Sequence, residues 1–303
     1  MSNYSSSKFD FNDPNTSWFK TFNLVPDRAE VLDIGCSNGT FGEQLIKQKA
    51  CVVDGIEVDD GDIAEAKKKL RNVYKIDIER DEIDIDHSYD VIFMGDVIEH
   101  LADPAHALKR IKKLLNDDGV LIFSMPNITH MSVRLMLLAG NIEYGRTGLL
   151  DETHLHFYNR EEIYRVLNAA GYKVKTFEYT VNDVPFDLAK RELAELGLTP
   201  GKKFKDLLRT TNAAAYQFIG VAEKSKKAVR QSLPASSPDN IVGNYIDELK
   251  ADYEKVIKDL KLNLEKTAED RDRVVADRDR LKDEMSHTIA NRTLRYAKRK
   301  LKR

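Results

Sequence analysis

Residues 30–42 read EVLDIGCSNGTFG, and this stretch decides the fold of the chain. It begins with a short apolar run, which predicts a buried β-strand. Gly35 and Gly39 then bracket a tight turn, and apolar residues at helical spacing follow from Phe41. A strand, a glycine turn and a helix in this order predict a ligand-binding α/β unit, because the turn lets the backbone approach a ligand closely.

The turn does not match the pattern that binds a dinucleotide. That pattern requires glycine at positions 35, 37 and 40, whereas Ser37 and Thr40 stand at two of them. The sequence therefore argues against NAD as the ligand.

The same turn resembles the first motif of the class I S-adenosylmethionine (SAM)-dependent methyltransferases. Asp33, Gly35 and Gly39 match that motif, and Ser37 replaces its frequent middle glycine. The resemblance implies that SAM is the cofactor. It also implies that these residues and Cys36, a small residue of the loop, surround the methionine half of SAM.

Two further strand ends carry acidic residues at the spacing that this family implies. Glu57, followed by Val58, closes the apolar strand 52–57, about 20 residues after the turn. A carboxylate offers two acceptors to the two donors of a ribose diol, so Glu57 is expected to bind the ribose. Asp77 closes the third strand; by resemblance it accepts from the adenine amino group while the amide of Ile78 meets the ring.

The third strand is expected to span 72–78. The fourth strand, 89–94, leads to Asp96, which by resemblance lies beneath the sulfonium and the methyl group, and to Val97, which lines the adenine side. A helix over 104–115 and a fifth strand over 120–125 are expected to follow. Strands that alternate with helices predict a parallel sheet with right-handed crossovers. The strands 172–179 and 216–222 resemble the antiparallel closing pair of the family. The expected fold class is therefore α/β, a Rossmann-like methyltransferase sheet followed by a long α-helical coiled coil.

Residues 149–158, LLDETHLHFY, closely resemble a segment of methyltransferases found with bacterial cell-surface polysaccharide enzymes. That resemblance implies O-methylation of a sugar hydroxyl in a surface glycan, such as an O-antigen or a lipid-linked saccharide, including the step that ends chain growth. Two alternatives stay open. One is O-methylation of a quinone-like or secondary metabolite, and the other is a non-catalytic SAM-binding scaffold.

A sugar hydroxyl is a weak nucleophile, so a base that accepts its proton is useful, and histidine is suited to that task near neutral pH. His154 is the first candidate, His130 the second and His156 the third, with Asp151 placed to orient His154. A metal site of Asp96, Asp151 and His154 is conceivable. Nothing in the spacing demands it, and no metal is expected.

Composition narrows the class of protein. The 303 residues include 48 basic and 50 acidic side chains, a balance that argues against a nucleic-acid-binding surface. No segment reaches about 18 consecutive apolar residues, and no signal peptide is evident, so a cytoplasmic protein is expected.

Composition changes after Lys224, which predicts four parts: a methyltransferase domain (1–224), a flexible linker (225–242), a coiled-coil helix (243–291) and a basic amphipathic tail (292–303). The apolar seam of the helix predicts a homo-oligomer or pairing with a glycosyltransferase. The tail predicts contact with an anionic membrane surface on the inner face of the cell membrane.

Overall fold

The computed structural model describes residues 13–225, 280 and 282–284. The chain divides into two units, residues 1–233 and 234–303. Residues 280 and 282–284 are helical. The predicted linker, coiled coil and basic tail otherwise lie outside the described residues and stay predictions. In the described part, no helix has both the length and the apolar character needed to cross a bilayer.

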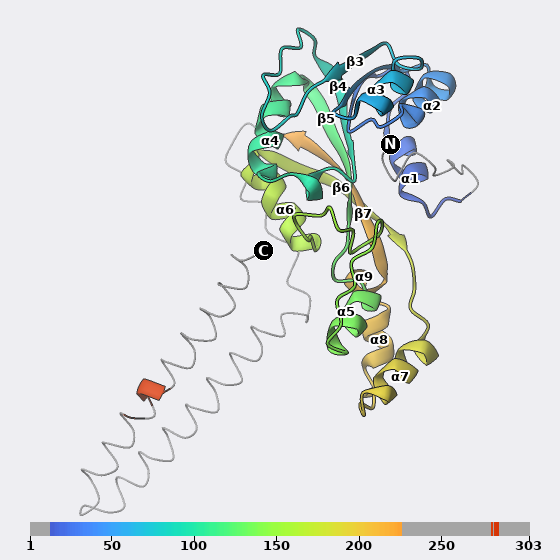
Figure 1. The fold of residues 1–303 in the computed structure, drawn as a ribbon, viewed down its shortest axis with the longest axis vertical. Helices are drawn as coiled ribbons and strands as arrows, with labels where there is room; N and C mark the ends of the chain where they lie inside the picture. Colours follow the sequence, from blue (N-terminus) through green and yellow to red (C-terminus); the bar gives the residue numbers. More distant parts are fainter. Residues whose placement is uncertain (1–12, 226–279, 281, 285–303) are drawn as a thin grey trace, which may run out of the picture. The chain divides into compact units, whose positions relative to one another are not determined.

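A seven-stranded sheet forms the centre of the first unit (Figure 1), in the order β3-β2-β1-β4-β5-β7-β6. Neighbouring strands from β3 to β5 pair in parallel, whereas β7 runs antiparallel to both β5 and β6. This topology confirms the predicted Rossmann-like sheet with its antiparallel closing pair. The strands are β1 (Glu30–Ile34), β2 (Val52–Glu57), β3 (Asn72–Lys75), β4 (Tyr89–Gly95), β5 (Leu115–Pro126), β6 (Tyr172–Val181) and β7 (Ala215–Lys224).

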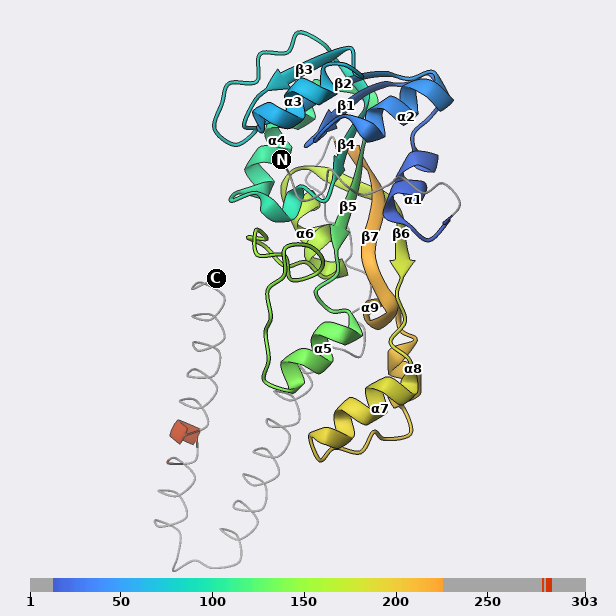
Figure 2. The same ribbon diagram turned by 45° about the vertical axis from the view of Figure 1, so that its right-hand side comes forward.

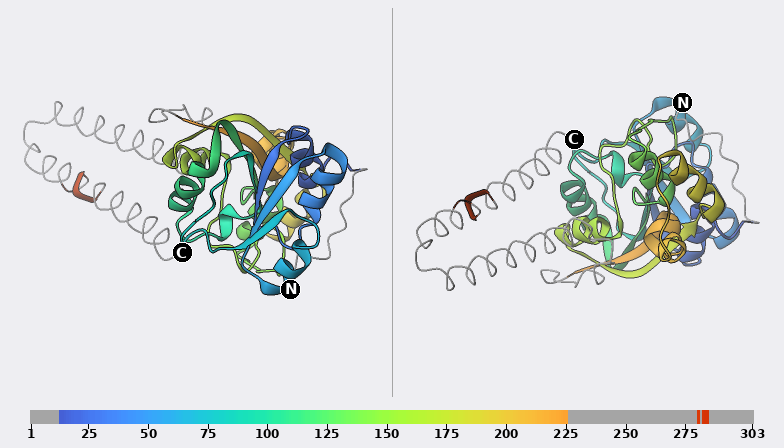
Figure 3. Two further views of the ribbon diagram at one scale, coloured as in Figure 1. Left: turned by 90° about the horizontal axis from the view of Figure 1, so that it is seen from above. Right: turned by 90° about the horizontal axis from the view of Figure 1, so that it is seen from below.

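Helices cover both faces of the sheet. One face carries α1 (Ser17–Leu24), α2 (Thr40–Lys49) and α3 (Asp60–Ala66), and the other carries α4 (Pro104–Ile111) and α6 (Arg160–Ala169), as Figure 3 shows from above and below. Beyond the end of the sheet lie four further helices (Figure 2): α5 (Met131–Leu138), α7 (Phe186–Glu195), α8 (Phe204–Leu208) and α9 (Thr211–Ala214). The 3-10 turns η1 (Ile98–His100) and η2 (Lys112–Leu114) complete the described elements.

Alternation along the strands divides the core into two layers. Val31 and Val91 pack with α1–α3, whereas Leu32 and Ile92 pack with α4 and α6. Since successive strand side chains point to opposite faces, Asp33 shares the face of Val31. Strand alternation therefore directs the Asp33 side chain to the face of the sheet that α1–α3 cover.

The structure corrects three predicted boundaries. The helix predicted to run to Leu115 ends at Ile111, and the fifth strand begins at Leu115 rather than Val120. The reason is a bulge: Tyr89 pairs with Leu115 and Val91 with Val120, so residues 116–119 loop out of β5 and do not stop a helix. The third strand was predicted to reach Ile78 but ends at Lys75.

Candidate functional site

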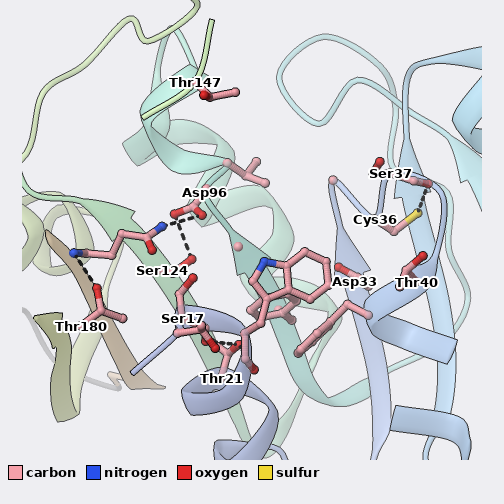
Figure 4. Close-up of a pocket in the computed structure, with 18 of the residues that line it drawn as sticks. Ser17, Thr21, Asp33, Cys36, Ser37, Thr40, Asp96, Ser124, Thr147 and Thr180 are labelled. Atoms are coloured by element: carbon pink, nitrogen blue, oxygen red, sulfur yellow. Dashed lines mark hydrogen bonds between the residues drawn. The ribbon is translucent and has the colours of Figure 1, made fainter. Parts of the chain in front are cut away.

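A cavity of about 890 Å³ opens at the carboxyl ends of the central parallel strands. Its lining combines the turn after β1, the ends of β2 and β4, and side chains from α1, β6 and β7. Figure 4 shows Asp33, Cys36 and Ser37 on one side of it, and Asp96 with Ser124 on the other. Ligands of open α/β sheets bind in this crevice, outside the carboxyl ends of the strands.

The turn after β1 needs glycine for both conformation and space. Gly35 has a φ of 71°, and a Cβ there would lie 2.6 Å from Cγ2 of Val97. The amides of Gly35 and Cys36 donate to the carbonyl of Ile56 at 2.9 and 3.1 Å, which ties the turn to the end of β2. The backbone therefore passes close to the cavity without a side chain in the way.

Glu57 is held by main-chain amides at the end of β2. Its Oε2 accepts from the amide of Ser37 at 2.9 Å, and its Oε1 accepts from Val58 at 2.7 Å and from Asp59 at 3.1 Å. The carboxylate lines the cavity. It is therefore fixed where the sequence predicts contact with ribose hydroxyls.

Asp33 is a buried acid in the cavity wall. It is 2% exposed, and its Oδ2 makes no hydrogen bond within the described part of the chain. Burial, reinforced by the charge of Glu57, raises the pKa of Asp33 to about 7. A cationic ligand in the cavity would stabilise the ionised form of this carboxyl.

Asp96 closes the cavity on the side of β5 and β7. It has a φ of 53°, a left-handed conformation uncommon for a residue with a side chain. Its Oδ1 accepts from Ser124 Oγ at 3.0 Å, and its Oδ2 accepts from Gln217 Nε2 at 2.8 Å. Burial raises the pKa of Asp96, and these two donors oppose that rise. The carboxylate is thus fixed by neighbours from two other strands.

The sequence did not assign the helix α1 to the site, yet α1 forms one wall of the cavity. Asn15, just before α1, pairs in both directions with the main chain of Val181, through bonds of 2.7 and 2.8 Å. Trp18 packs edge-on against Phe41, with ring centroids 5.6 Å apart. These contacts join segments far apart in sequence, and no local pattern signals them.

The cofactor residues predicted from sequence divide into two groups. Six of them line the one cavity: Asp33, Gly35, Cys36, Glu57, Asp96 and Val97. The other four are not part of that lining: Gly39, Val58, Asp77 and Ile78.

Each of these four residues has a local role. Gly39 caps α2 with a φ of 75°, and Val58 is exposed. Asp77 accepts from the amide of Glu79 at 2.9 Å, and Ile78 is buried in the core. Their cofactor contacts remain predictions.

None of the predicted catalytic residues lines the cavity. Both ring nitrogens of His130 are engaged, with Ser132 Oγ at 2.7 Å and the carbonyl of Asn182 at 2.6 Å. Asp151 accepts from the amide and hydroxyl of Thr153, and its charge acts on His154, which is 9% exposed. Their roles in catalysis stay predictions.

A histidine that the sequence did not place in the site, His100, does line the cavity. It follows β4 directly and packs edge-on against His154, with ring centroids 4.8 Å apart. In the described part, Glu99, His100 and His154 each bring a potential metal ligand atom within 4.8 Å of the others. This set shares only His154 with the set considered from sequence.

The model of one protein family matches residues 16–176, more than half of the chain, and its description is a methyltransferase domain. A ubiquinone biosynthesis O-methyltransferase of Neisseria meningitidis serogroup A is 31% identical over 118 residues, which cover 36% of this chain and 49% of the relative. A probable SAM-dependent methyltransferase of Mycolicibacterium smegmatis is 28% identical over 169 residues, 52% of this chain and 60% of the relative.

The chain thus spans about half to three fifths of the length of these curated relatives. Among solved structures, a TehB-like SAM-dependent methyltransferase from Corynebacterium glutamicum matches with a TM-score of 0.43 and 18% identity. That match covers 69% of this chain and 87% of the other.

Proposed function

This chain belongs to the methyltransferase-domain family, and we propose that it is a SAM-dependent methyltransferase that methylates a hydroxyl oxygen of a small-molecule acceptor. The observation that carries this proposal is the single cavity that joins the glycine turn and Glu57 to Asp96. At about 890 Å³ it lies toward the upper end of the 300–1,000 Å³ that is typical of ligand pockets. It therefore has room for an acceptor beside the cofactor.

The positions of the acidic groups suit a cationic cofactor. In the proposed complex Glu57 would bind the ribose, Asp33 would lie beside the turn that carries the methionine half, and Asp96 would face the sulfonium. Methyl transfer from a sulfonium is an in-line displacement that depends mainly on how the two reactants are positioned. Fixed carboxylates such as Asp96, held by Ser124 and Gln217, supply that positioning without reorganisation during the reaction.

The relatives support a small molecule over the surface glycan that residues 149–158 suggested. Several are named ubiquinone biosynthesis O-methyltransferases, with identities of about 30% to this chain. We therefore place the quinone-like acceptor first and the sugar second.

One observation favours the sugar as the second candidate. The part of the cavity beyond Asp96 is lined by polar side chains, among them Thr147, Thr180 and Asn182. Hydroxyl and amide groups suit an acceptor that carries several hydroxyls. A polyhydroxylated acceptor has more donors and acceptors for these groups than a prenylated phenol has.

An acceptor panel tests the proposal. The full chain is incubated with SAM and a catechol, a polyprenylated phenol, free sugars or a lipid-linked saccharide, and S-adenosylhomocysteine is quantified. The proposal expects turnover with a phenolic acceptor and a product heavier by one CH2 group, and no turnover when that hydroxyl is already methylated. Turnover with the saccharides alone would select the second candidate.

The alternative of a non-catalytic SAM-binding scaffold predicts a different result in the same assay. A chain that binds SAM but yields no S-adenosylhomocysteine above the no-acceptor control, with every hydroxyl acceptor, would contradict the proposed O-methylation.

A further inference from the structure

Glu99 carries a carboxyl group in an environment that disfavours a charge. It lies in η1 just after β4, is 0% exposed, and neither carboxyl oxygen makes a hydrogen bond within the described residues. Burial, with the charge of Asp96 beside it, raises the pKa of Glu99 well above its usual range. A buried carboxyl without partners is costly unless a cation or a donor meets it.

The contacts of His100 assign its tautomer. Its Nδ1 lies 3.2 Å from the carbonyl oxygen and 3.1 Å from the hydroxyl oxygen of Thr153. That hydroxyl donates its one proton to Asp151 Oδ1 at 2.6 Å, so both oxygens can only accept from His100. Nδ1 therefore carries the proton, and the lone pair of the neutral ring is on Nε2.

The contacts of His154 lead to the opposite tautomer. Its Nδ1 is buried and makes no hydrogen bond within the described residues, and a hydrogen bond to the main chain of Leu149 favours a proton on the ring. A neutral ring protonated on Nε2 carries its lone pair on Nδ1.

From these contacts we propose that Glu99, His100 and His154 bind one divalent transition-metal ion in the wall of the cavity. Two imidazole nitrogens and one carboxylate suit Zn²⁺, Fe²⁺, Mn²⁺ or Co²⁺, whereas Mg²⁺ prefers oxygen ligands. Main-chain contacts hold the two rings, as is usual for histidines that ligate a metal. The amides of Leu155 and His156 donate to the carbonyl of Glu99, which holds the two segments together.

The ligand atoms must approach one another to bind a metal. They lie within 4.8 Å of one another, whereas tetrahedral ligands at about 2.0–2.2 Å from a metal lie about 3.3–3.6 Å apart. Side-chain rotation that brings the most distant pair together by about 1 Å closes this difference. His100 lines the cavity, so a metal at this position has an open side toward the acceptor.

The role of the metal in the reaction rests on the proposed O-methylation. A hydroxyl bound to the metal loses its proton more readily. Its oxygen pair then forms a bond to the methyl carbon as the carbon–sulfur bond breaks, with that pair going to sulfur. The products are the methyl ether, S-adenosylhomocysteine and one proton released to solvent.

The test uses the full chain without a polyhistidine tag, stripped with EDTA. Co²⁺ is titrated while its visible d–d absorption is recorded, and Zn²⁺ and Mg²⁺ are then added as competitors. The proposal expects one Co²⁺ per chain, displaced by Zn²⁺ and not by equimolar Mg²⁺. His154→Gln and Glu99→Gln should weaken Co²⁺ binding by about 100-fold or more, since outer-shell changes alone cost 10–100-fold.

His106→Gln and Glu152→Gln are the matched controls, because both side chains are exposed and outside the three residues. They should bind Co²⁺ like the unaltered chain. Circular dichroism verifies folding, and His100→Gln, at a half-buried position, provides a second ligand variant if His154→Gln does not fold. Absence of saturable Co²⁺ binding, or equal affinity in His154→Gln and His106→Gln, would overturn the site.

The same experiment separates the site from the proposed function. Co²⁺ binding is measured without SAM or acceptor, so it stands even if no acceptor is ever methylated. Full turnover by the EDTA-stripped chain would remove the metal from the reaction and leave the O-methylation intact.

Discussion

The main-chain amide of Ser37 donates to Oε2 of Glu57 over 2.9 Å, and this bond makes the turn after β1 and the end of β2 one unit. Two more amides, those of Val58 and Asp59, bind the other carboxyl oxygen. A carboxylate has about four lone-pair sites, so these three bonds leave about one of them for a ribose hydroxyl. We propose that the side chain that orders the turn also binds the ribose.

Glu57→Gln should weaken SAM binding by about 10–100-fold, because a hydrogen bond to a charged group contributes about 1.5–3 kcal/mol. The NH2 group of the glutamine would also face main-chain N–H donors, from which it cannot accept a hydrogen bond. Isothermal titration with SAM measures the affinity, and Asp60→Asn, which alters an exposed carboxylate nearby, is the control. Unchanged affinity in Glu57→Gln would remove Glu57 from the cofactor site.

SAM binding should release a proton near neutral pH. In the free protein burial raises the pKa of Asp33 to about 7, and a bound cation lowers it. Affinity should thus rise with pH up to about 7 and level off above it, and fall by up to tenfold per pH unit below it. Titration calorimetry in buffers of different ionisation enthalpy counts the proton. In Asp33→Asn this pH dependence should disappear; its persistence would point to another group.

The free protein should lose stability from Asp33 ionisation as pH rises. The folded pKa of about 7 lies above the ordinary value of 3.8, so the folded state holds the proton more tightly. The contribution of Asp33 therefore becomes less favourable between about pH 4 and pH 7 and is constant above that range. Urea unfolding of Asp33→Asn and the unaltered chain at pH 5 and pH 8 measures it. The advantage of the variant should be larger at pH 8.

Gly35→Ala should destabilise the protein by at least about 1–2 kcal/mol, the cost of a left-handed backbone in a residue with a Cβ. The new methyl would also lie 2.6 Å from Val97 Cγ2. Gly201→Ala is the control, because no heavy atom lies within 4 Å of a Cβ there. Urea midpoints at equal slope measure both. Equal stability of the two variants would contradict the tight turn.

Gln217→Leu should slow turnover about tenfold, with a smaller effect on SAM affinity. The substitution removes a 2.8 Å donor from Asp96, so this half-buried carboxylate is less well fixed for its proposed contact with the sulfonium. Gln48→Leu, at an exposed position of α2, is the control. Steady-state kinetics with the acceptor identified by the panel measure this effect. A normal rate would show that Asp96 functions without the hydrogen bond from Gln217.

Truncation after residue 233 tests the coiled coil proposed for residues 243–291. The full chain should sediment as an oligomer and the truncated chain as a monomer. Equal subunit counts would exclude the C-terminal helix as the oligomerising element.

The sequence predicted the centre of the site because local rules determine it. Strand alternation and glycine spacing place Asp33, Glu57 and Asp96 at strand ends, and the ends of parallel strands meet at one edge. Asp77 shows the limit of this reasoning, because β3 ends at Lys75 and the Asp77 carboxylate caps a local turn.

The remaining walls come from contacts without a local signal. Asn15 meets Val181 across 166 positions, and Gln217 meets Asp96 across 121. The Thr153 hydroxyl donates to Asp151 and accepts from Nδ1 of His100, so Thr153 links Asp151 to His100. The predicted orientation of His154 by Asp151 stays a prediction. No local pattern in the sequence indicates which of the nearby histidines Thr153 contacts, so only the folded chain shows that it is His100.

A crystal structure of the full chain with S-adenosylhomocysteine tests the central claim most directly. The account predicts ribose hydroxyls on Glu57, the methionine half along the turn at Gly35, and the sulfur facing Asp96. A cofactor bound elsewhere, or with its ribose away from Glu57, would contradict it.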